Sequence, residues 1–464
     1  MTWRELALPI PMRRVAIVAS RAHLRDSLVR IADAGTVELV GALPPAEGEV
    51  VEAMRRVERS RPESALEPPR VALGPVDVGR LERAEARGLL AGEAELLRRS
   101  ALARPHGSFA VLVGWMADRD IARLGEDLRP LGGGVVELPR PRWVDPPTSF
   151  GPTPVRRAFR PLVTTYGVAR YADVDVTPFA AVSFMVMFGM MFGDVGHGLV
   201  LAVLGLMLRR AGPRLAAFRP LWPFLVGSGL VAAVFGLLYG EAFGPTGLVP
   251  TLWLNPIDDI ETLLVTALGV GVALLAVSHA YGIVNRWREQ GPRAALFSQT
   301  GVAGLGVLLG IVVAGLGVYA SEPVAVVAGA GVALVGAVLM AVGFAAAVTG
   351  GVGLVEAGIE LVDALVRVVS NLLSFTRLAA FGLMHAALGL VVLEAARSLW
   401  GTPVGVVLAA IVFLAGNAVA FSLELLVTGV QALRLEFYEL FSRVFAGEGH
   451  PFAPWALPVT EEVS

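Results

Sequence analysis

Apolar and polar positions divide the chain into two parts of different character. From about residue 177 onward, seven runs of mainly apolar residues follow one another, each long enough to span a bilayer as a helix. Before that point, short strand-like segments alternate with helical ones and charged residues are frequent. The pattern predicts an α-helical polytopic membrane domain of about eight transmembrane helices, the last two long, behind an N-terminal α/β domain. The apolar runs cover residues 179–208, 221–243, 260–285, 297–320, 323–350, 360–397 and 403–440.

The polar N-terminal third contains what looks like one strand–helix–strand unit in two copies. Between the copies, the charged segments 46–60 and 77–100 carry leucines at helical spacing, which predicts a pair of antiparallel helices. We expect two small α/β lobes joined by a helical stalk, with one compact α/β domain as the alternative. The expected strands are residues 13–18, 36–40, 108–114 and 134–138, and the second copy's helix is 118–130.

Arginine placement predicts the topology. The loops 209–219 and 284–296 are rich in arginine and should face the cytoplasm, whereas 244–261 carries only acidic charges. The first apolar run must therefore leave and return before Arg209. Its halves are only about 14 residues each, roughly 20 Å of helix, so we expect a broken pair of helices packed against protein. The residues assigned to this break are Gly193, Asp194, Gly196 and His197, with the glycines making the turn.

Composition sharpens this picture. Hydrophobic residues make up 55% and charged residues 17% of the 464 positions, and 26 of the 38 basic residues lie in residues 1–170. The absence of cysteine excludes Cys-ligated metals, and we expect no metal site, no cofactor and no catalytic centre. The N-terminus lacks a signal-peptide pattern, so the first domain is expected in the cytoplasm. Eight crossings would return the C-terminus to the cytoplasm as well, and we expect a prokaryotic cell membrane. A net charge of −2 indicates no nucleic-acid partner.

The expected boundaries are 1–165 (soluble domain), 166–178 (linker), 179–445 (membrane domain) and 446–464 (cytoplasmic tail).

Ionisable residues inside the last two apolar runs are functional candidates, because a charge within a spanning helix costs several kcal/mol. One polar stripe follows the sixth run, and His385 lies eight residues beyond its last member, about 12 Å along a helix axis. The Arg377 guanidinium would be a permanent positive charge at membrane depth, able to attract a carboxylate from a partner. The stripe consists of Asp363, Arg367, Ser370, Ser374 and Arg377.

A second stripe follows the last apolar run. Two long helices with facing polar stripes are typical of a lined proton or ion route; the alternative is that these groups pair and hold the helices together. For Asp194 and His197, a structural hydrogen-bonding role at the break is favoured over ion transfer. The second stripe consists of Asn417, Glu424, Thr428, Gln431 and Arg434.

Five motifs carry a resemblance to a known family. In order they are PLVTTYGVARYADVDVTPF (161–179), FGMMFGDVGHGLVL (188–201), FGLLYGEAFG (235–244), SNLLSFTRLAAFGLMHAAL (370–388) and QALRLEFYELFSRVFAGEGHPFAPW (431–455). Over about residues 145–458 the chain resembles the V-type ATPase 116 kDa subunit family, also called subunit a or subunit I. The soluble domain is about half as long as is usual in that family.

The resemblance implies a function and residue roles. The chain would be the membrane stator of a V/A-type rotary ATPase or ATP synthase, a non-catalytic subunit that lines two half-channels for H⁺ or Na⁺. Arg377 would match the essential arginine that meets the ring carboxylate, with His385 after it. Asp363 would belong to one half-channel, and Glu424 and Arg434 would match positions of the last helix. Implied partners are a ring of small membrane subunits (c/K type), peripheral stalk subunits (E/G type) on the N-terminal domain, a central-stalk cap subunit (d/C type) and the lipid bilayer.

Two rival hypotheses remain open. A secondary transporter also uses broken helices and intramembrane charges, although no convincing internal repeat is present. A purely structural paralogue would explain the short N-terminal domain, but Arg377, Glu424 and Arg434 argue against it.

Overall fold

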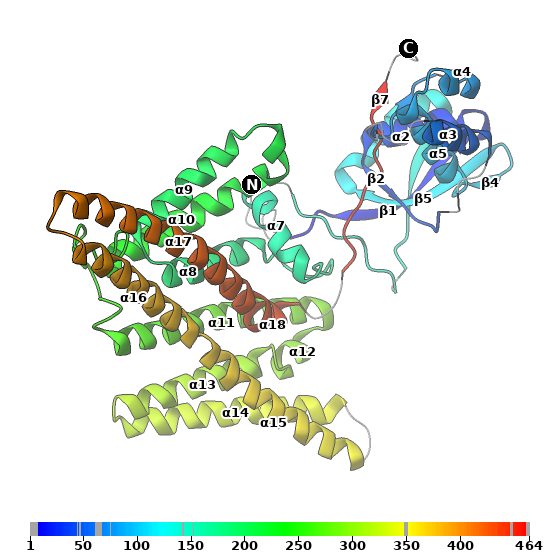
Figure 1. The fold of residues 1–464 in the computed structure, drawn as a ribbon. Coiled ribbons are helices and arrows are strands. Elements are labelled where there is room, and N and C mark those ends of the chain that lie inside the picture. The colour runs from blue at the N-terminus through cyan, green and yellow to red at the C-terminus, as the bar shows by residue number, and fades with distance from the viewer. Residues whose placement is uncertain are drawn as a thin grey trace. The chain divides into compact units, whose positions relative to one another are not determined.

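The chain forms two units (Figure 1). The computed structural model describes residues 8–460 except residues 44, 46, 47, 61–66, 75, 142, 152, 348–350 and 446–448. The N-terminal unit contains Met1–Gly151, Ala169–Tyr171 and Gly449–Ser464, and the helical unit contains Pro152–Val168 and Ala172–Glu448. Parts of two expected features, the N-terminus (1–7) and the tail (446–448 and 461–464), lie outside the described residues.

The N-terminal unit is built around one main sheet whose strands differ in length. Strand β1 (Met12–Ser20) lies between β5 (Phe109–Ala117) and β6 (Gly134–Leu138), antiparallel to both, with Met12 opposite Ala117 and Ser20 opposite Phe109. The prediction of two lobes is therefore wrong: strands from both copies share one sheet, because the apolar faces of β1 and β5 are buried together in one core. The remaining strands, β2 (Val37–Leu39) and β4 (Arg104–His106), both pair with β5.

Helices complete this unit. The predicted helix pair is present as α3 (Glu49–Ser60) packed against α5 (Arg87–Ser100), around a small core with Leu81, Leu89 and Leu90. The segment joining them is partly helical as α4 (Val78–Arg83), and the Asp77 side chain caps its first turn. The other helices are α2 (Leu24–Ala34), α6 (Ile121–Leu128), η1 (Arg21–His23), η2 (Asp118–Asp120) and η3 (Arg129–Leu131).

Residues 449–460, far from the other strands in sequence, complete the same unit. Strand β7 (Val459–Thr460) pairs in parallel with β3 (Val71–Ala72), and Trp455 and Leu457 are buried in the core beneath the main sheet. The Trp455 amide donates to the Val37 carbonyl at 2.8 Å. Residues 449–460, expected to be a tail, are thus built into the N-terminal unit because their apolar side chains complete its core.

The helical unit begins earlier than the expected boundary at residue 179. Helix α7 (Pro154–Tyr166) packs against α8 (Thr177–Met191) and α10 (Trp222–Tyr239). A buried ion pair between Arg156 and Asp175 fixes the segment that was expected to be a linker.

Six helical segments among the described residues are long and apolar enough to cross a membrane, and two shorter apolar helices, α8 and α9 (Val195–Arg209), precede them. The last two are the longest, at 44 residues (Val355–Ser398) and 42 residues (Pro403–Val444). The predicted fold class, a polytopic membrane domain with an N-terminal α/β domain, is confirmed. The other helices are η4 (Pro213–Leu221), α11 (Ile260–Gln290), α12 (Pro292–Phe297), α13 (Val302–Tyr319), α14 (Pro323–Ala347), α15 (Gly351–Ser374), α16 (Thr376–Ser398), α17 (Pro403–Leu435), the π-helix η5 (Glu436–Phe441) and α18 (Ser442–Val444).

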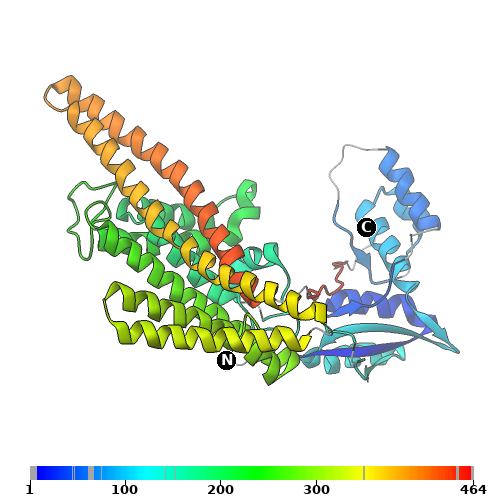
Figure 2. The same ribbon diagram turned by 90° about the horizontal axis from the view of Figure 1, so that it is seen from below.

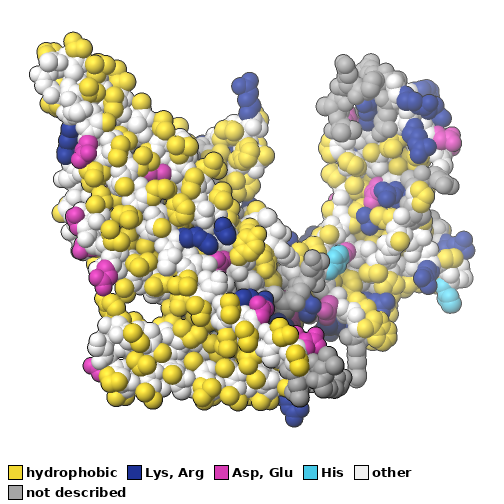
Figure 3. Space-filling model, turned by 60° about the horizontal axis from the view of Figure 1, so that its bottom comes forward, with side chains coloured by type: hydrophobic (Ala, Val, Ile, Leu, Met, Phe, Trp, Pro, Cys, Tyr) yellow, Lys and Arg dark blue, Asp and Glu magenta, His cyan; other side chains and the backbone are white. Residues whose placement is uncertain are grey.

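Neighbouring helices of this unit pack in pairs. Helices α13 and α14 lie side by side, as do α16 and α17, which form the long orange arm in Figure 2. On the face drawn in Figure 3, hydrophobic side chains predominate over these helices and charged ones are scattered. Large apolar side chains exposed along α15 and α17, such as Ile359, Val366, Leu414 and Leu426, are the surface expected of helices that face lipid or another apolar helix.

The break in the first apolar run lies between Met191 and Val195. The glycines near it serve a different purpose from the one expected. Among the described residues, none of Gly193, Gly196 and Gly198 has a positive φ. A Cβ atom on Gly198 would lie 2.6 Å from the backbone of Gly229 and Ala233, and one on Gly196 would lie 2.5 Å from the Phe243 ring. These glycines permit close packing of α9 on α10 and its following loop.

Candidate functional site

Asp194 occupies the break and holds it together. Its Oδ1 accepts hydrogen bonds from the backbone amides of His197 (2.8 Å) and Phe243 (2.9 Å), and its Oδ2 accepts one from Gly244 (2.7 Å). The first bond caps α9, and the other two fix the loop that follows α10. The carboxylate is completely buried, so backbone amides replace the water that it would otherwise need.

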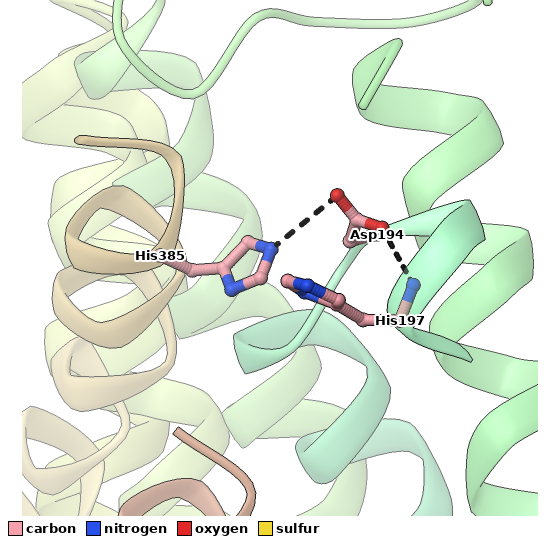
Figure 4. Close-up of side chains that lie close together, drawn as sticks. All are labelled: Asp194, His197 and His385. Carbon is pink, nitrogen blue, oxygen red and sulfur yellow. Dashed lines mark hydrogen bonds and ion pairs between the residues drawn. The ribbon is translucent and has the colours of Figure 1, made fainter. Parts of the chain in front are cut away.

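Four further ionisable side chains lie near Asp194. His385 of α16 directs its Nε2 toward Asp194 Oδ2 at 3.8 Å and toward Glu241 Oε2 at 3.7 Å. Its other ring nitrogen, Nδ1, is hydrogen-bonded to Glu424 of α17. Figure 4 shows the His385 ring pointing toward Asp194 with His197 beside them, and the two imidazole centroids are 5.7 Å apart. We call Asp194, His197, Glu241, His385 and Glu424 the buried cluster.

Several polar atoms of the buried cluster have no hydrogen-bond partner among the described residues. They are both ring nitrogens of His197, both carboxylate oxygens of Glu241, Nε2 of His385 and Oε1 of Glu424. Asn417 approaches His197, but its amide nitrogen donates to the Phe413 carbonyl. Each of the five residues is at most 4% exposed. Buried polar groups without partners are costly, so the cluster is built to receive water, protons or another cation.

Arg377 lies about 12 Å from His385 along α16, at the beginning of that helix. Its Nη1 is 3.6 Å from Oε1 of Glu439, and the arginine side chain is 29% exposed against 6% for the glutamate. The positive charges of Arg434 and Arg443 also act on Glu439. Glu439 lies in η5, where the wider π-helical turn changes the direction of the side chains after α17.

The remaining predicted site residues do not belong to the buried cluster. Asp363 and Arg367 form an exposed pair one turn apart on α15, and the Ser374 hydroxyl donates to the Ser370 carbonyl. Thr428 is buried and Gln431 is half-buried on α17, whereas Arg434 is exposed. The sixth run has a one-residue interruption at Phe375, between α15 and α16, and its stripe continues across that point to Arg377.

Sequence reasoning missed Glu241 and Glu439. Glu241 follows directly after α10 in FGLLYGEAFG, an acidic residue at the edge of an apolar run, and only the fold brings it to His385. Sequence analysis missed Glu439 because it assumed α-helical spacing, whereas the side chains of the π-helical turn point in different directions. Two other buried groups hold helices together: Ser183 donates to Glu436, and Arg443 contacts His279 at 2.9 Å.

Comparison with known proteins identifies the chain's relatives. The model of the V-type ATPase 116 kDa subunit family matches residues 111–242, a range that contains Asp194, His197 and Glu241. The A-type ATP synthase subunit I of Pyrococcus horikoshii is 26% identical over 374 residues, 77% of this chain. That of Archaeoglobus fulgidus is 28% identical over 363 residues, 67% of this chain. These matches confirm that the chain resembles the V-type ATPase 116 kDa subunit family.

The likeness extends to a eukaryotic member of the 116 kDa subunit family. The human V-type proton ATPase 116 kDa subunit a 3 is 32% identical over 154 residues, covering 30% of this chain and 19% of that protein. The chain spans about half the length of the curated relatives that it matches: the aligned region covers 55% of the Pyrococcus protein and 53% of the Archaeoglobus protein.

Proposed function

We propose that this chain is the membrane stator subunit of a V/A-type rotary ATPase or ATP synthase, and that it carries H⁺ or Na⁺ across the bilayer beside a rotating ring. The proposal rests on the resemblance to this family, on the apolar helical unit and above all on the buried cluster. Carboxylates and imidazoles from α9, α16, α17 and the end of α10 meet there within a few ångströms of one another. Groups of this kind can pass protons between them when water fills the gaps.

The buried cluster would form the inner end of one half-channel. Its neighbour along α16 is Arg377, so an ion arriving at His385 has about 12 Å left to reach the arginine. Thr428 and Gln431, on α17 between Glu424 and Arg434, offer a hydroxyl and an amide along the same stretch. The loop 244–261, with its acidic charges, would face the side opposite to the cytoplasm.

The second half-channel would lie on the other side of Arg377. Asp363 and Ser374 line this side of the arginine on α15, together with Arg367. These side chains are exposed or half-buried in the isolated chain, which suits a surface that is completed by a second protein. The partner expected here is the ring of small membrane subunits.

Arg377 would separate the two half-channels. Its guanidinium keeps its charge, and it repels a cation that attempts to pass directly. A ring carboxylate arriving from lipid is neutral, because burying its charge is costly, and it ionises when it meets the arginine. In this chain Glu439 occupies one side of the guanidinium. The ring carboxylate would therefore approach the part of Arg377 that remains exposed.

The other expected partners follow from the proposed complex. The N-terminal unit would bind peripheral stalk subunits (E/G type), and a central-stalk cap subunit (d/C type) is a further candidate. ATP would be bound and hydrolysed on other subunits, with both termini of this chain in the cytoplasm. None of the relatives named above favours the alternative of a secondary transporter.

Replacement of Arg377 tests the proposal. In the purified complex reconstituted into vesicles, Arg377→Ala should abolish ATP-driven H⁺ or Na⁺ uptake, while ATP hydrolysis by the soluble head continues. Arg397→Ala is the matched control, because Arg397 is an exposed arginine on the same helix; that variant should pump normally. Undiminished uptake by Arg377→Ala would exclude the assigned role.

A further inference from the structure

The buried cluster contains the donor set of a transition-metal site. Among the described residues, Asp194, His197 and His385 each offer one ligand atom, and these atoms lie within 4.8 Å of one another. Two imidazoles with one or two carboxylates are ligands that zinc and neighbouring divalent metals favour. We propose that this cluster binds one divalent transition-metal ion, with zinc as the reference ion, through His197, His385 and Asp194.

The hydrogen bonds of the cluster already orient these ligands. Glu424 holds Nδ1 of His385, which leaves Nε2 facing Asp194 and Glu241. A carboxylate behind a ligating histidine is the usual outer support of a metal site, because it fixes the tautomer and the ring direction. Backbone amides fix Asp194 in the same way: Oδ1 accepts two bonds and Oδ2 only one, so Oδ2 retains a lone pair beside His385.

The unpartnered atoms point to a cation as the missing component. His197 has no hydrogen bond at either ring nitrogen, and both oxygens of Glu241 are unpartnered within the described residues. An imidazole must be neutral to bind a metal, so three buried carboxylates would leave up to three negative charges in the cluster, and a divalent ion would offset two of them. Glu241 Oε2, at 3.7 Å from His385 Nε2, places a further carboxylate beside these ligands.

Zinc binding would require the ligand atoms of Asp194, His197 and His385 to move slightly closer together. Ligand atoms around tetrahedral zinc lie about 3.4 Å apart, given bond lengths of roughly 2.0–2.2 Å. The Asp194–His385 pair is already at 3.8 Å, and because all the ligand atoms lie within 4.8 Å of one another, no pair would have to close by more than about 1.4 Å. Neither ring nitrogen of His197 has a hydrogen-bond partner among the described residues, so this side chain is the ligand best able to adjust.

Equilibrium binding tests the site on the full chain purified in detergent. Zinc titrated by calorimetry should bind with one equivalent that His197→Phe removes. Phenylalanine keeps the ring packed against Phe192, Phe243 and Phe421 but offers no ligand. We expect affinity to fall by more than the roughly 10–100-fold typical of losing an outer-shell partner, and Glu424→Gln should fall within that range. His106→Ala, an exposed histidine of the N-terminal unit, is the control and should bind as the unmodified chain does.

X-ray absorption at the zinc edge supplies a second readout, since it should report imidazole nitrogen ligands in the unmodified chain and fewer in His197→Phe. Absence of a one-equivalent site, or a site that persists unchanged in His197→Phe, would overturn the proposal. The metal site does not depend on the proposed function; only its consequence does, namely that bound zinc blocks ion flux through the half-channel. Binding without inhibition would contradict the half-channel and leave the metal site in place.

Discussion

At the scale of single residues, the pairing of Arg377 with Glu439 is the feature that most changes how the arginine can act. Arg377 Nη1 and Glu439 Oε1 are 3.6 Å apart, and the arginine side chain is only partly exposed. Its positive charge therefore faces Glu439 on one side and the surface of the protein on the other. A partly buried ion pair is worth less than its Coulomb attraction because both groups lose water. Removing one partner is nevertheless costly, since the other charge then stays buried alone.

The first prediction concerns this pair. Glu439→Gln should lower the stability of the full chain by about 1–3 kcal/mol, because Arg377 loses its counter-charge. Thermal unfolding in detergent measures the loss. In a double-mutant cycle with Arg377→Gln, we expect a coupling of about 0.5–3 kcal/mol. Glu394→Gln, an exposed glutamate of α16, should leave the midpoint unchanged. Strictly additive effects of the two substitutions would mean that no pair exists.

Sequence reasoning located most of the ionisable residues but not their partners. Arg377, His385 and Glu424 stand out in the sequence because a charge in an apolar run is rare. Their contacts come from helices far apart in sequence: His385 meets Asp194 across 191 positions, and Glu424 meets His385 across 39. Periodicity describes one helix at a time. It therefore cannot tell that Asp194 and His385 share one cluster whereas Asp363 faces outward with Arg367.

At the scale of elements, the contact between α9 and α10 sets the position of the break. Gly198 and Gly229 face each other so closely that a Cβ atom on Gly229 would lie 2.5 Å from the Gly198 carbonyl oxygen. Small residues allow two backbones to approach in this way, and dispersion contacts then hold helices together without a hydrophobic driving force. The predicted turn glycines were correct in residue type but not in purpose, because sequence alone does not distinguish a glycine needed for conformation from one needed for space.

The second prediction tests this contact. Gly229→Ala should destabilise the chain by about 1–3 kcal/mol, the usual cost of overpacking, since a methyl group must displace backbone atoms of α9. Gly269→Ala is the matched control: it lies on α11 in open space, and alanine there should be neutral or stabilising by up to about 1 kcal/mol. Unfolding midpoints in one detergent compare the two. Equal midpoints for both variants would show that the α9–α10 contact tolerates more space than its geometry indicates.

At the scale of the whole molecule, residues 449–460 belong to the N-terminal unit although all the apolar helices precede them in sequence. The sequence suggested a tail because this stretch is short and follows the last apolar run. The pairing of β7 with β3 and the burial of Trp455 depend on the surface that the N-terminal strands present, which no local pattern reveals. Fold class was predictable from hydrophobic periodicity; this long-range closure was not.

The third prediction follows from the burial of Trp455, which is 6% exposed. Trp455→Ala should cost the N-terminal unit about 3–5 kcal/mol, as expected for removal of a buried tryptophan. Limited proteolysis should then cleave residues 8–140 faster than in the unmodified chain. Trp143→Ala is the control within the same unit, because Trp143 is 87% exposed and its removal leaves no cavity. Equal proteolysis rates for both variants would indicate that the closure contributes little.

The parallel strand pair β3–β7 has a consequence for biosynthesis. A ribosome reads the codons for β1 to β6 first, then those for every apolar helix, and only then those for Trp455, Leu457 and β7. Until Trp455 and Leu457 are synthesised, the part of the N-terminal core that they cover would stay exposed while the translocon inserts the helices. Completion of the N-terminal unit would therefore follow insertion of the helices, and a chaperone that shields its uncovered apolar surface would be needed only for that interval.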